Sequence, residues 1–263
     1  MGLEMLSIWE PGALFFGLVV GSFANVCIHR IPRGESIVLP ASHCPRCGRP
    51  IRPWDNVPVL SYLVLLGRCR DCRARISPRY PLVELANGLL YWGIAATSVP
   101  GPTPAVHMAL ATALVILALI DVERFILPNV ITLPGIVVGL AASFLPDARL
   151  SPLESAGSAA GGYLLFALVG VAYQKLRRVE GLGQGDWKMV AMLGAFLGWR
   201  QTLLTILLAS VLGTIVGVAV GLRRGRDIRR QRVPLGTFLA LAALIVLFVG
   251  EGILSWYGGF FRV

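Results

Sequence analysis

The chain has 263 residues and a formal net charge of +10, and 56% of its residues are apolar while only 14% are charged. Soluble domains carry about 25% charged residues, so this composition excludes an ordinary soluble globular protein. About 20 consecutive apolar residues span the hydrocarbon core of a bilayer, and the apolar residues here come in long blocks. We therefore predict an all-α, multi-pass membrane protein with about eight transmembrane helices. The expected spans are 11–29, 80–98, 105–120, 129–146, 155–174, 188–199, 202–222 and 234–256.

The first apolar block differs from a cleaved signal peptide. Glu4 and Glu10 precede it where a signal peptide has basic residues, and no small-residue cleavage site follows it. Residues 1–29 are therefore predicted to form a retained transmembrane helix.

Basic residues are distributed unevenly over the expected loops. If the spans alternate in direction, the loops 30–79, 121–128, 175–188 and 223–232 share one side of the membrane and hold 21 of the 24 Lys and Arg residues. Short cytosolic loops are enriched in Lys and Arg, so we expect these loops, and any site among them, to face the cytosol. The same asymmetry accounts for the net charge without a nucleic-acid partner. The arginine run in 223–232 is interpreted as an anchor to membrane lipids.

The loop 30–79 is the longest and carries four of the five cysteines. They form two Cys-x-x-Cys pairs separated by 21 residues, a pattern typical of a tetrahedral zinc site. Two disulfides and a redox pair are alternatives, but disulfides are rare in a reducing cytosol. Four thiolates leave no open position, so the predicted zinc has a structural role. The ligands are Cys44, Cys47, Cys69 and Cys72, in a small cytosolic domain inserted after the first helix.

Two carboxylates stand out in the remaining core, residues 80–263. Asp121 follows directly on the apolar run 113–120, and Pro128 prevents the helix from continuing far beyond it. An ionisable residue at the end of a span indicates function. Glu123 is a third carboxylate close enough in sequence to take part.

Asp186 follows glycines 181, 183 and 185 in the loop before the sixth block. Gly183 and Gly185 permit unusual backbone angles and close approach to another helix end. Because both acids are expected on one membrane face, they could meet as an aspartic-protease pair in which the two carboxylates share a proton. Alternatively, Asp186 caps its own helix or pairs with Lys188, and Asp121 pairs with Arg124. A proton relay in a transporter is a further alternative, but no inverted repeat is evident.

The order of these motifs resembles the type IV prepilin peptidases of bacterial inner membranes. Gly183-Gln-Gly185-Asp186 is similar to the Gly-x-Gly-Asp signature of membrane aspartyl proteases. Asn129 stands where many family members carry Asp, and Ala24 where Leu is common. The other segments that carry the resemblance are 21–32, 42–47, 55–62, 67–72, 76–84 and 233–238.

The resemblance implies a function for the whole chain. Family members remove the leader peptide of prepilins and pseudopilins on the cytosolic side, with the residues that match Asp121 and Asp186 here as catalytic carboxylates. Those that keep the cysteine loop also N-methylate the new terminal residue with S-adenosylmethionine. The alternative for this chain is a peptidase only, whose zinc domain docks the substrate. The residues that would bind the methyl donor, and the oligomeric state, are not indicated.

Overall fold

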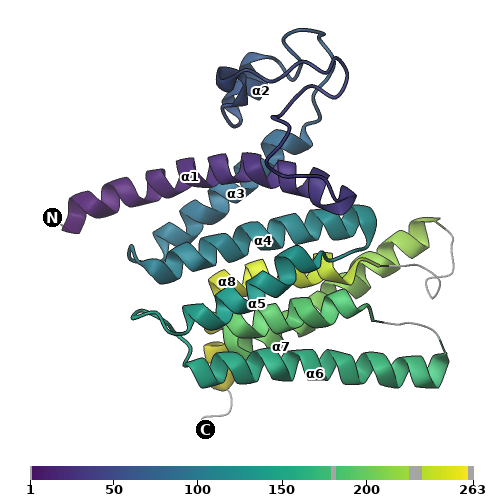
Figure 1. The fold of residues 1–263 in the computed structure, drawn as a ribbon. Coiled ribbons are helices and arrows are strands. Elements are labelled where there is room, and N and C mark those ends of the chain that lie inside the picture. The colour runs from purple at the N-terminus through teal and green to yellow at the C-terminus, as the bar shows by residue number, and fades with distance from the viewer. Residues whose placement is uncertain (1, 179–181, 225–232, 260–263) are drawn as a thin grey trace. The chain divides into compact units, whose positions relative to one another are not determined.

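The computed structural model describes residues 2–178, 182–224 and 233–259, with only the backbone at 2–7 and 224. Most of the predicted basic run, Arg226, Arg229, Arg230 and Arg232, lies outside the described residues, as does Gly181. The described parts form helices and no named strand (Figure 1). The helices are α1 (Gly2–Arg30), η1 (Ile31–Arg33), η2 (Pro53–Asn56), α2 (Leu60–Val64), α3 (Arg79–Ala96), α4 (Pro102–Arg124), α5 (Asn129–Ala142), α6 (Pro152–Arg177), α7 (Gln184–Arg224) and α8 (Leu235–Gly259).

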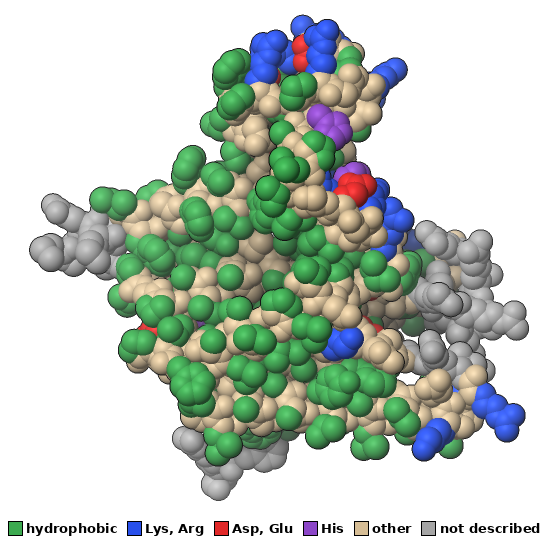
Figure 2. All heavy atoms as spheres, in the orientation of Figure 1, with side chains coloured by type: hydrophobic (Ala, Val, Ile, Leu, Met, Phe, Trp, Pro, Cys, Tyr) green, Lys and Arg blue, Asp and Glu red, His purple; other side chains and the backbone are tan. Residues whose placement is uncertain are grey.

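Long apolar helices dominate the described residues. Five of them are long and apolar enough to cross a membrane, namely Ile8–Arg33, Pro102–Arg124, Pro152–Arg177, Gln184–Arg223 and Leu235–Gly259. Outward-facing apolar side chains cover these helices (Figure 2), and Leu164, Leu168 and Leu176 of α6 are 64%, 71% and 82% exposed. Such a surface is stable only in an apolar solvent. The prediction of an all-α, multi-pass membrane protein is confirmed, while the number of spans stays a prediction.

Helix α7 is broken at one residue. Gly198 has φ 74° and ψ 171°, which are not helical angles. An unbroken helix of this length would extend about 60 Å, roughly twice the hydrocarbon core. The break divides α7 into a first arm (184–197) and a second arm (199–224), which correspond to the expected blocks 188–199 and 202–222. Where the sequence suggests a short connection between two blocks, the chain turns at a single glycine in the left-handed region.

The chain forms two compact units, residues 1–116 and 117–263. In the first unit α1 packs on α3, and their close approach is fixed by a buried polar network. Asn87, fully buried, donates to the carbonyl oxygen of Gly17 at 2.8 Å and accepts from the Thr112 hydroxyl at 2.9 Å. Hydrogen bonds of this kind between apolar helices fix their register.

In the second unit the first arm of α7 is the buried centre. It packs along α6 through small residues, and Ser155 of α6 donates to the carbonyl oxygen of Ala195 at 2.7 Å. A Cβ added at Gly194 would overlap the carbonyl oxygen of Ser158. Glycine is therefore required at 194 for the two helices to approach this closely.

This contact predicts the effect of a single methyl group. Gly194→Ala should lower the free energy of unfolding by about 2 kcal/mol through overpacking, and the detergent-solubilised protein should melt about 5 °C lower. Gly252→Ala on α8 is the matched control, because nothing lies within 4 Å of a Cβ at that position. Equal melting temperatures for both variants would contradict the described α6–α7 packing.

Candidate active site and metal centre

Asp121 lies in the last turn of α4 and is only 5% exposed. The helix stops just after it, where Phe125 adopts φ 56° and donates its N–H to the carbonyl oxygen of Asp121 at 2.8 Å. Pro128 then precedes α5 in an extended conformation. The chain turn predicted from Pro128 is thus present and leaves the Asp121 side chain at the end of an apolar helix.

The carboxylate of Asp121 contacts the beginning of α8. Its Oδ2 accepts hydrogen bonds from the backbone N–H of Thr237 at 2.8 Å and from the Thr237 hydroxyl at 3.2 Å. The same hydroxyl lies 3.0 Å from the carbonyl oxygen of Ala118. The first N–H groups of a helix lack partners within it and favour a negative charge nearby. Asp121 therefore satisfies the N-terminus of α8 while it is held in one position.

Asp186 lies in the first turn of α7. Its Oδ2 accepts from the backbone N–H of Gly183 at 3.1 Å, and its own N–H donates to the carbonyl oxygen of Gly183 at 3.0 Å. The first of these bonds is one half of a capping box, in which the side chain at the third helical position accepts the N–H of the N-cap residue, so the capping role considered from the sequence is present. The hydrogen bond from Gly183 uses only one of the two carboxylate oxygens of Asp186. The charge of Asp121 also acts on Asp186. The structure thus brings the two predicted acids within electrostatic range.

Leu127 fits between the two segments that carry these acids. A Cβ added at Gly185 would lie 3.0 Å from the Leu127 Cβ, and one added at Gly236 would lie 2.8 Å from the Leu127 Cδ2. Gly185 precedes Asp186, and Gly236 precedes Thr237. One side chain therefore sets the spacing of the Asp186 turn and the α8 N-terminus that binds Asp121.

The other predicted residues of this region have distinct places. Lys188 donates to Oδ1 of Asn129 at 2.9 Å, which links the first turns of α7 and α5. Because Asn129 is an uncharged amide, this contact is a hydrogen bond and not an ion pair. Glu123 is exposed, whereas Asp121 is buried. Residues two apart on a helix leave it in nearly opposite directions.

Sequence reasoning assigned no role to Thr237 or Leu127. Thr237 belongs to the segment 233–238, which carries part of the family resemblance, and Pro234 just before α8 is a recognisable helix-start signal. Its pairing with Asp121 over 116 positions could not be read from local pattern.

The four cysteines of the long loop converge. Their sulfur atoms all lie within 4.8 Å of one another, and Cys44 Sγ and Cys72 Sγ are 3.8 Å apart. Zinc–thiolate bonds of about 2.3 Å in a tetrahedron place sulfurs about 3.8 Å apart. All four are free thiols, so the disulfide alternative is not what the structure shows. Backbone N–H groups of Cys47 and Arg46 lower the pKa of the Cys44 thiol to about 6, which favours the thiolate that binds metals.

Both Cys-x-x-Cys pairs have the same local structure. In each, the first cysteine donates its N–H to a carbonyl five residues on, Arg49 for Cys44 and Ala74 for Cys69. The residue after each second cysteine is left-handed, Gly48 with φ 70° and Arg73 with φ 58°. Two such turns facing each other form a four-sulfur cage, and the residues present fit a tetrahedral metal ion.

Ion pairs hold this cage together. Arg49, two residues after the first Cys-x-x-Cys pair, contacts Asp71 within the second pair at 2.9 Å. Arg70 makes two hydrogen bonds to Asp55, at 2.6 and 2.8 Å, and holds the pKa of Asp55 below its ordinary value. Figure 2 shows Lys and Arg side chains gathered over this loop.

The loop is also tied to helix α3. Glu84 of α3 is 8% exposed, and its Oε2 accepts the backbone N–H of Val59 at 2.8 Å. Val59 has φ 61°, an unfavourable angle for a β-branched residue. The buried hydrogen bond to a carboxylate helps to offset the cost of that conformation.

A helical membrane protein with two acids at neighbouring helix ends and a four-cysteine loop belongs to a narrow class. Residues 15–98 match the Bacterial Peptidase A24 N-terminal domain, and residues 108–218 match the Type IV leader peptidase family. No solved structure matches the chain.

Named relatives extend the match to nearly the whole chain. A "Prepilin leader peptidase/N-methyltransferase" of Aeromonas salmonicida is 36% identical, over 92% of this chain and 91% of the relative. A protein of the same name from Pseudomonas aeruginosa is 39% identical, over 93% and 91%. One from Myxococcus xanthus is 44% identical, over 80% of this chain and 62% of the relative. The chain therefore belongs to the type IV leader peptidase family, and the predictions of this family and of an enzyme are confirmed.

The Asp121–Thr237 contact predicts a strict requirement at Gly236. A methyl group there would lie 3.0 Å from Asp121 Oδ2 and even closer to Leu127, so Gly236→Ala should displace the carboxylate. We expect turnover of a natural substrate to fall roughly tenfold to a hundredfold. Gly252→Ala should retain full activity, and an unchanged rate in Gly236→Ala would contradict the described geometry.

The cysteine cage predicts metal content. Purified protein should contain about one zinc per chain, measured by inductively coupled plasma mass spectrometry. Cys47→Ser should lose it, whereas Cys27→Ala, at a buried cysteine of α1 outside the cage, should keep it. Metal-free wild-type protein from a preparation without chelators would exclude the site.

Proposed function

We propose that this protein cleaves the leader peptide from type IV prepilins or pseudopilins and then N-methylates the new terminal residue. Its family membership supports the first activity, and the names of its relatives support both. The observation that carries the proposal is the placement of Asp121 and Asp186 at adjoining helix ends, joined through Leu127.

The proposed cleavage is a water attack assisted by both carboxylates. The ionised carboxylate takes a proton from the water molecule while the oxygen of that water bonds to the scissile carbonyl carbon. The protonated carboxylic acid donates its proton to the carbonyl oxygen, which gives a neutral tetrahedral intermediate. When the C–N bond breaks, the carboxylic acid formed in the first step gives its proton to the leaving amine, and one hydroxyl of the intermediate gives its proton to the other carboxylate as the new carboxyl group forms, so the pair returns to its starting state. This chemistry uses no metal and no covalent enzyme intermediate.

Asp121 and Asp186 are the pair in this proposal, and Glu123 is not a member. Asp121 is buried and fixed by Thr237, whereas Glu123 is exposed two residues later. Gly183 and Gly185 shape the Asp186 turn, and Lys188 anchors it to Asn129. These contacts position the acids without joining the chemistry.

The proposed orientation places this pair at the cytosolic side of the bacterial inner membrane. The ends of α4 and α6 nearest the site carry Arg124, Lys175 and Arg177. The cysteine loop would share that side, in keeping with the bias of Lys and Arg toward cytosolic loops. Prepilin leaders reach the enzyme from there.

Zinc is proposed to hold the cysteine loop in shape through Cys44, Cys47, Cys69 and Cys72. A loop with few buried apolar residues gains its fold from a metal. Methyl transfer requires S-adenosylmethionine as the donor. The match of the N-terminal domain over residues 15–98 and the relatives' names support this second activity.

The cleavage proposal is tested with detergent-purified protein, a prepilin and intact-mass measurement. Wild-type protein should remove the leader, and the product should gain one methyl group when S-adenosylmethionine is added. Asp121→Asn and Asp186→Asn should each reduce cleavage by at least about a thousandfold, because each removes one proton-transfer group.

Glu123→Gln is the matched control, since it makes the same acid-to-amide change two residues away and should cleave normally. The two Asp variants should still methylate a pilin whose leader has already been removed. Substantial cleavage by either Asp variant, or loss of cleavage in Glu123→Gln, would refute the assignment of the pair.

A further inference from the structure

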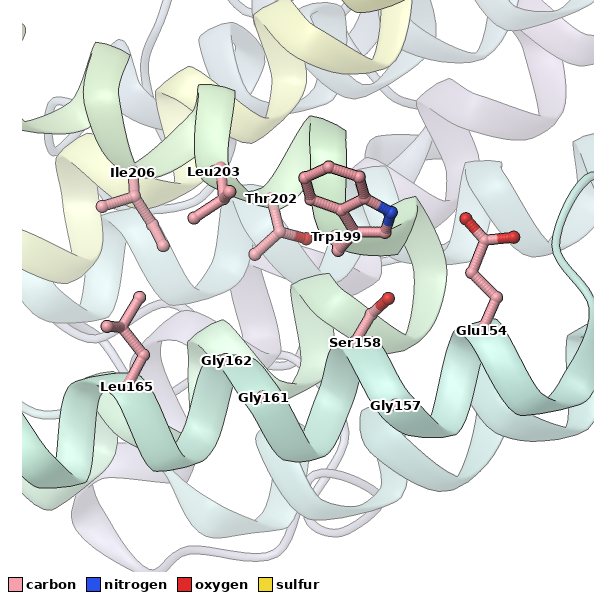
Figure 3. A pocket seen from close by; sticks show the side chains of 10 residues that line it. All are labelled: Glu154, Gly157, Ser158, Gly161, Gly162, Leu165, Trp199, Thr202, Leu203 and Ile206. Atoms are coloured by element: carbon pink, nitrogen blue, oxygen red, sulfur yellow. The ribbon is translucent and has the colours of Figure 1, made fainter.

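A groove lies between α6 and the second arm of α7 (Figure 3), and neither Asp121 nor Asp186 lines it. It has a volume of about 370 Å³. The residues that shape it are Gly157, Gly161 and Leu165 of α6 and Thr202, Leu203 and Ile206 of α7. The groove begins where α7 breaks at Gly198: the first arm packs on α6, and the second arm forms the other wall of the groove.

The two walls run in the same direction. Glu154 and Trp199 lie at one end of the groove, and Leu165 and Ile206 lie at the other (Figure 3). Both chains therefore advance from the Gly198 end toward the end of α6 that adjoins Asp186. Gly198 is twelve residues after Asp186, about 18 Å along a helix.

The α6 wall presents an open glycine stripe to the groove. Nothing lies within 4 Å of a Cβ added at Gly157 or Gly161, although most helical glycines of this unit are packed against a neighbour. Glycines four residues apart allow the backbone of another membrane helix to approach closely. The stripe alone does not specify an occupant, but Thr202 on the opposite wall supplies an independent observation.

Thr202 is 3% exposed, and its hydroxyl has no hydrogen-bond partner. The later hydroxyls of the same arm all bond four residues back: Thr205 to Gln201, Ser210 to Ile206 and Thr214 to Ser210. For Thr202 that position is Gly198, whose non-helical angles remove the acceptor. A buried hydroxyl without a partner is unfavourable, and this one belongs to a residue that lines the groove.

A second such atom belongs to the residue next to Asp186. Among the described residues, three buried side-chain polar atoms lack a partner, and one is Nε1 of Trp187, the neighbour of Asp186. Trp187 packs against Gly170 and stacks edge-on with Tyr163 at 6.0 Å, and Tyr163 adjoins the groove residue Gly162. The contacts of Trp187 therefore reach the part of α6 that is adjacent in sequence to the groove.

We propose that the groove holds the apolar transmembrane helix of the substrate while its scissile bond lies at Asp121 and Asp186. This inference rests on the proposed peptidase function. A peptide bond cleaved at the ends of membrane helices belongs to a chain that remains in the bilayer, and that chain needs a lateral path along the enzyme. An acyl chain would fill the groove but has no group to bond Thr202, whereas a helix offers carbonyl and side-chain acceptors.

Filling the groove tests this proposal, because a Cβ added at Gly161 has no atom of the enzyme within 4 Å. Gly161→Leu should lower kcat/KM for full-length prepilin roughly tenfold, mainly through KM. It should leave unchanged the cleavage of a short soluble peptide that has the leader and the scissile bond but no apolar segment. Gly252→Leu, also at an open glycine, should change neither rate.

The outcomes separate this inference from the proposed function. If wild-type protein cleaves neither substrate, the proposed function fails. Suppose that wild-type protein cleaves both substrates. If Gly161→Leu then cleaves full-length prepilin at the wild-type rate, or loses cleavage of full-length prepilin and of the short peptide equally, the groove is not the helix site.

A crosslinking measurement identifies the occupant. In one variant a photoreactive amino acid replaces Leu203, which lines the groove and is 48% exposed. In the control variant it replaces Leu241 of α8, which is 44% exposed. With Asp186→Asn to keep the prepilin intact, position 203 and not 241 should form an adduct of enzyme with prepilin. Adducts only with lipid, or only with a second copy of the enzyme, would overturn the proposal.

Discussion

The site depends on one buried contact, the carboxylate of Asp121 at the N-terminus of α8. In an apolar surrounding, the first N–H groups of α8 need acceptors, and Asp121 accepts both the N–H and the hydroxyl of Thr237. This contact joins two helix ends that are 116 residues apart in sequence. It also requires glycine at 236, and the space left there admits Leu127, which sets the position of the Asp186 turn through Gly185. Asp121, the acid that is expected to act on the substrate, therefore also joins the end of α4 to the beginning of α8.

The break at Gly198 has consequences of the same kind. Because the first arm of α7 packs on α6, Asp186 is held at the end of a buried helix, with Trp187 fixed against Gly170. After the break, the second arm packs on α8, where Gly213 lies against Phe238 and Gly217 against Val233. One left-handed glycine thus allows a single continuous segment to brace both sides of the site, and it leaves the groove beside α6 open.

Much of this arrangement could be predicted from the sequence, and the exceptions have physical causes. Hydropathy located the helices, and spacing identified the four cysteines, whose convergence depends on local turns. Asp121 and Asp186 were conspicuous because acids are rare beside apolar runs. The role of Thr237 could not be predicted, since it arises from packing between helices that are distant in the sequence. The break at Gly198 was visible only as a gap between two apolar blocks, because the dihedral angles of a glycine cannot be read from the sequence.

The central claim is that Asp121 and Asp186 occupy one site, and a chemical crosslink tests it without reference to activity. In a Cys27→Ala background with zinc bound to the other four cysteines, both acids are replaced by cysteine and treated with a short bifunctional thiol reagent. Digestion and mass spectrometry should then find a single reagent molecule joining the peptide that contains position 121 to the one that contains position 186. Two separately modified peptides, with no linked product, would contradict the account.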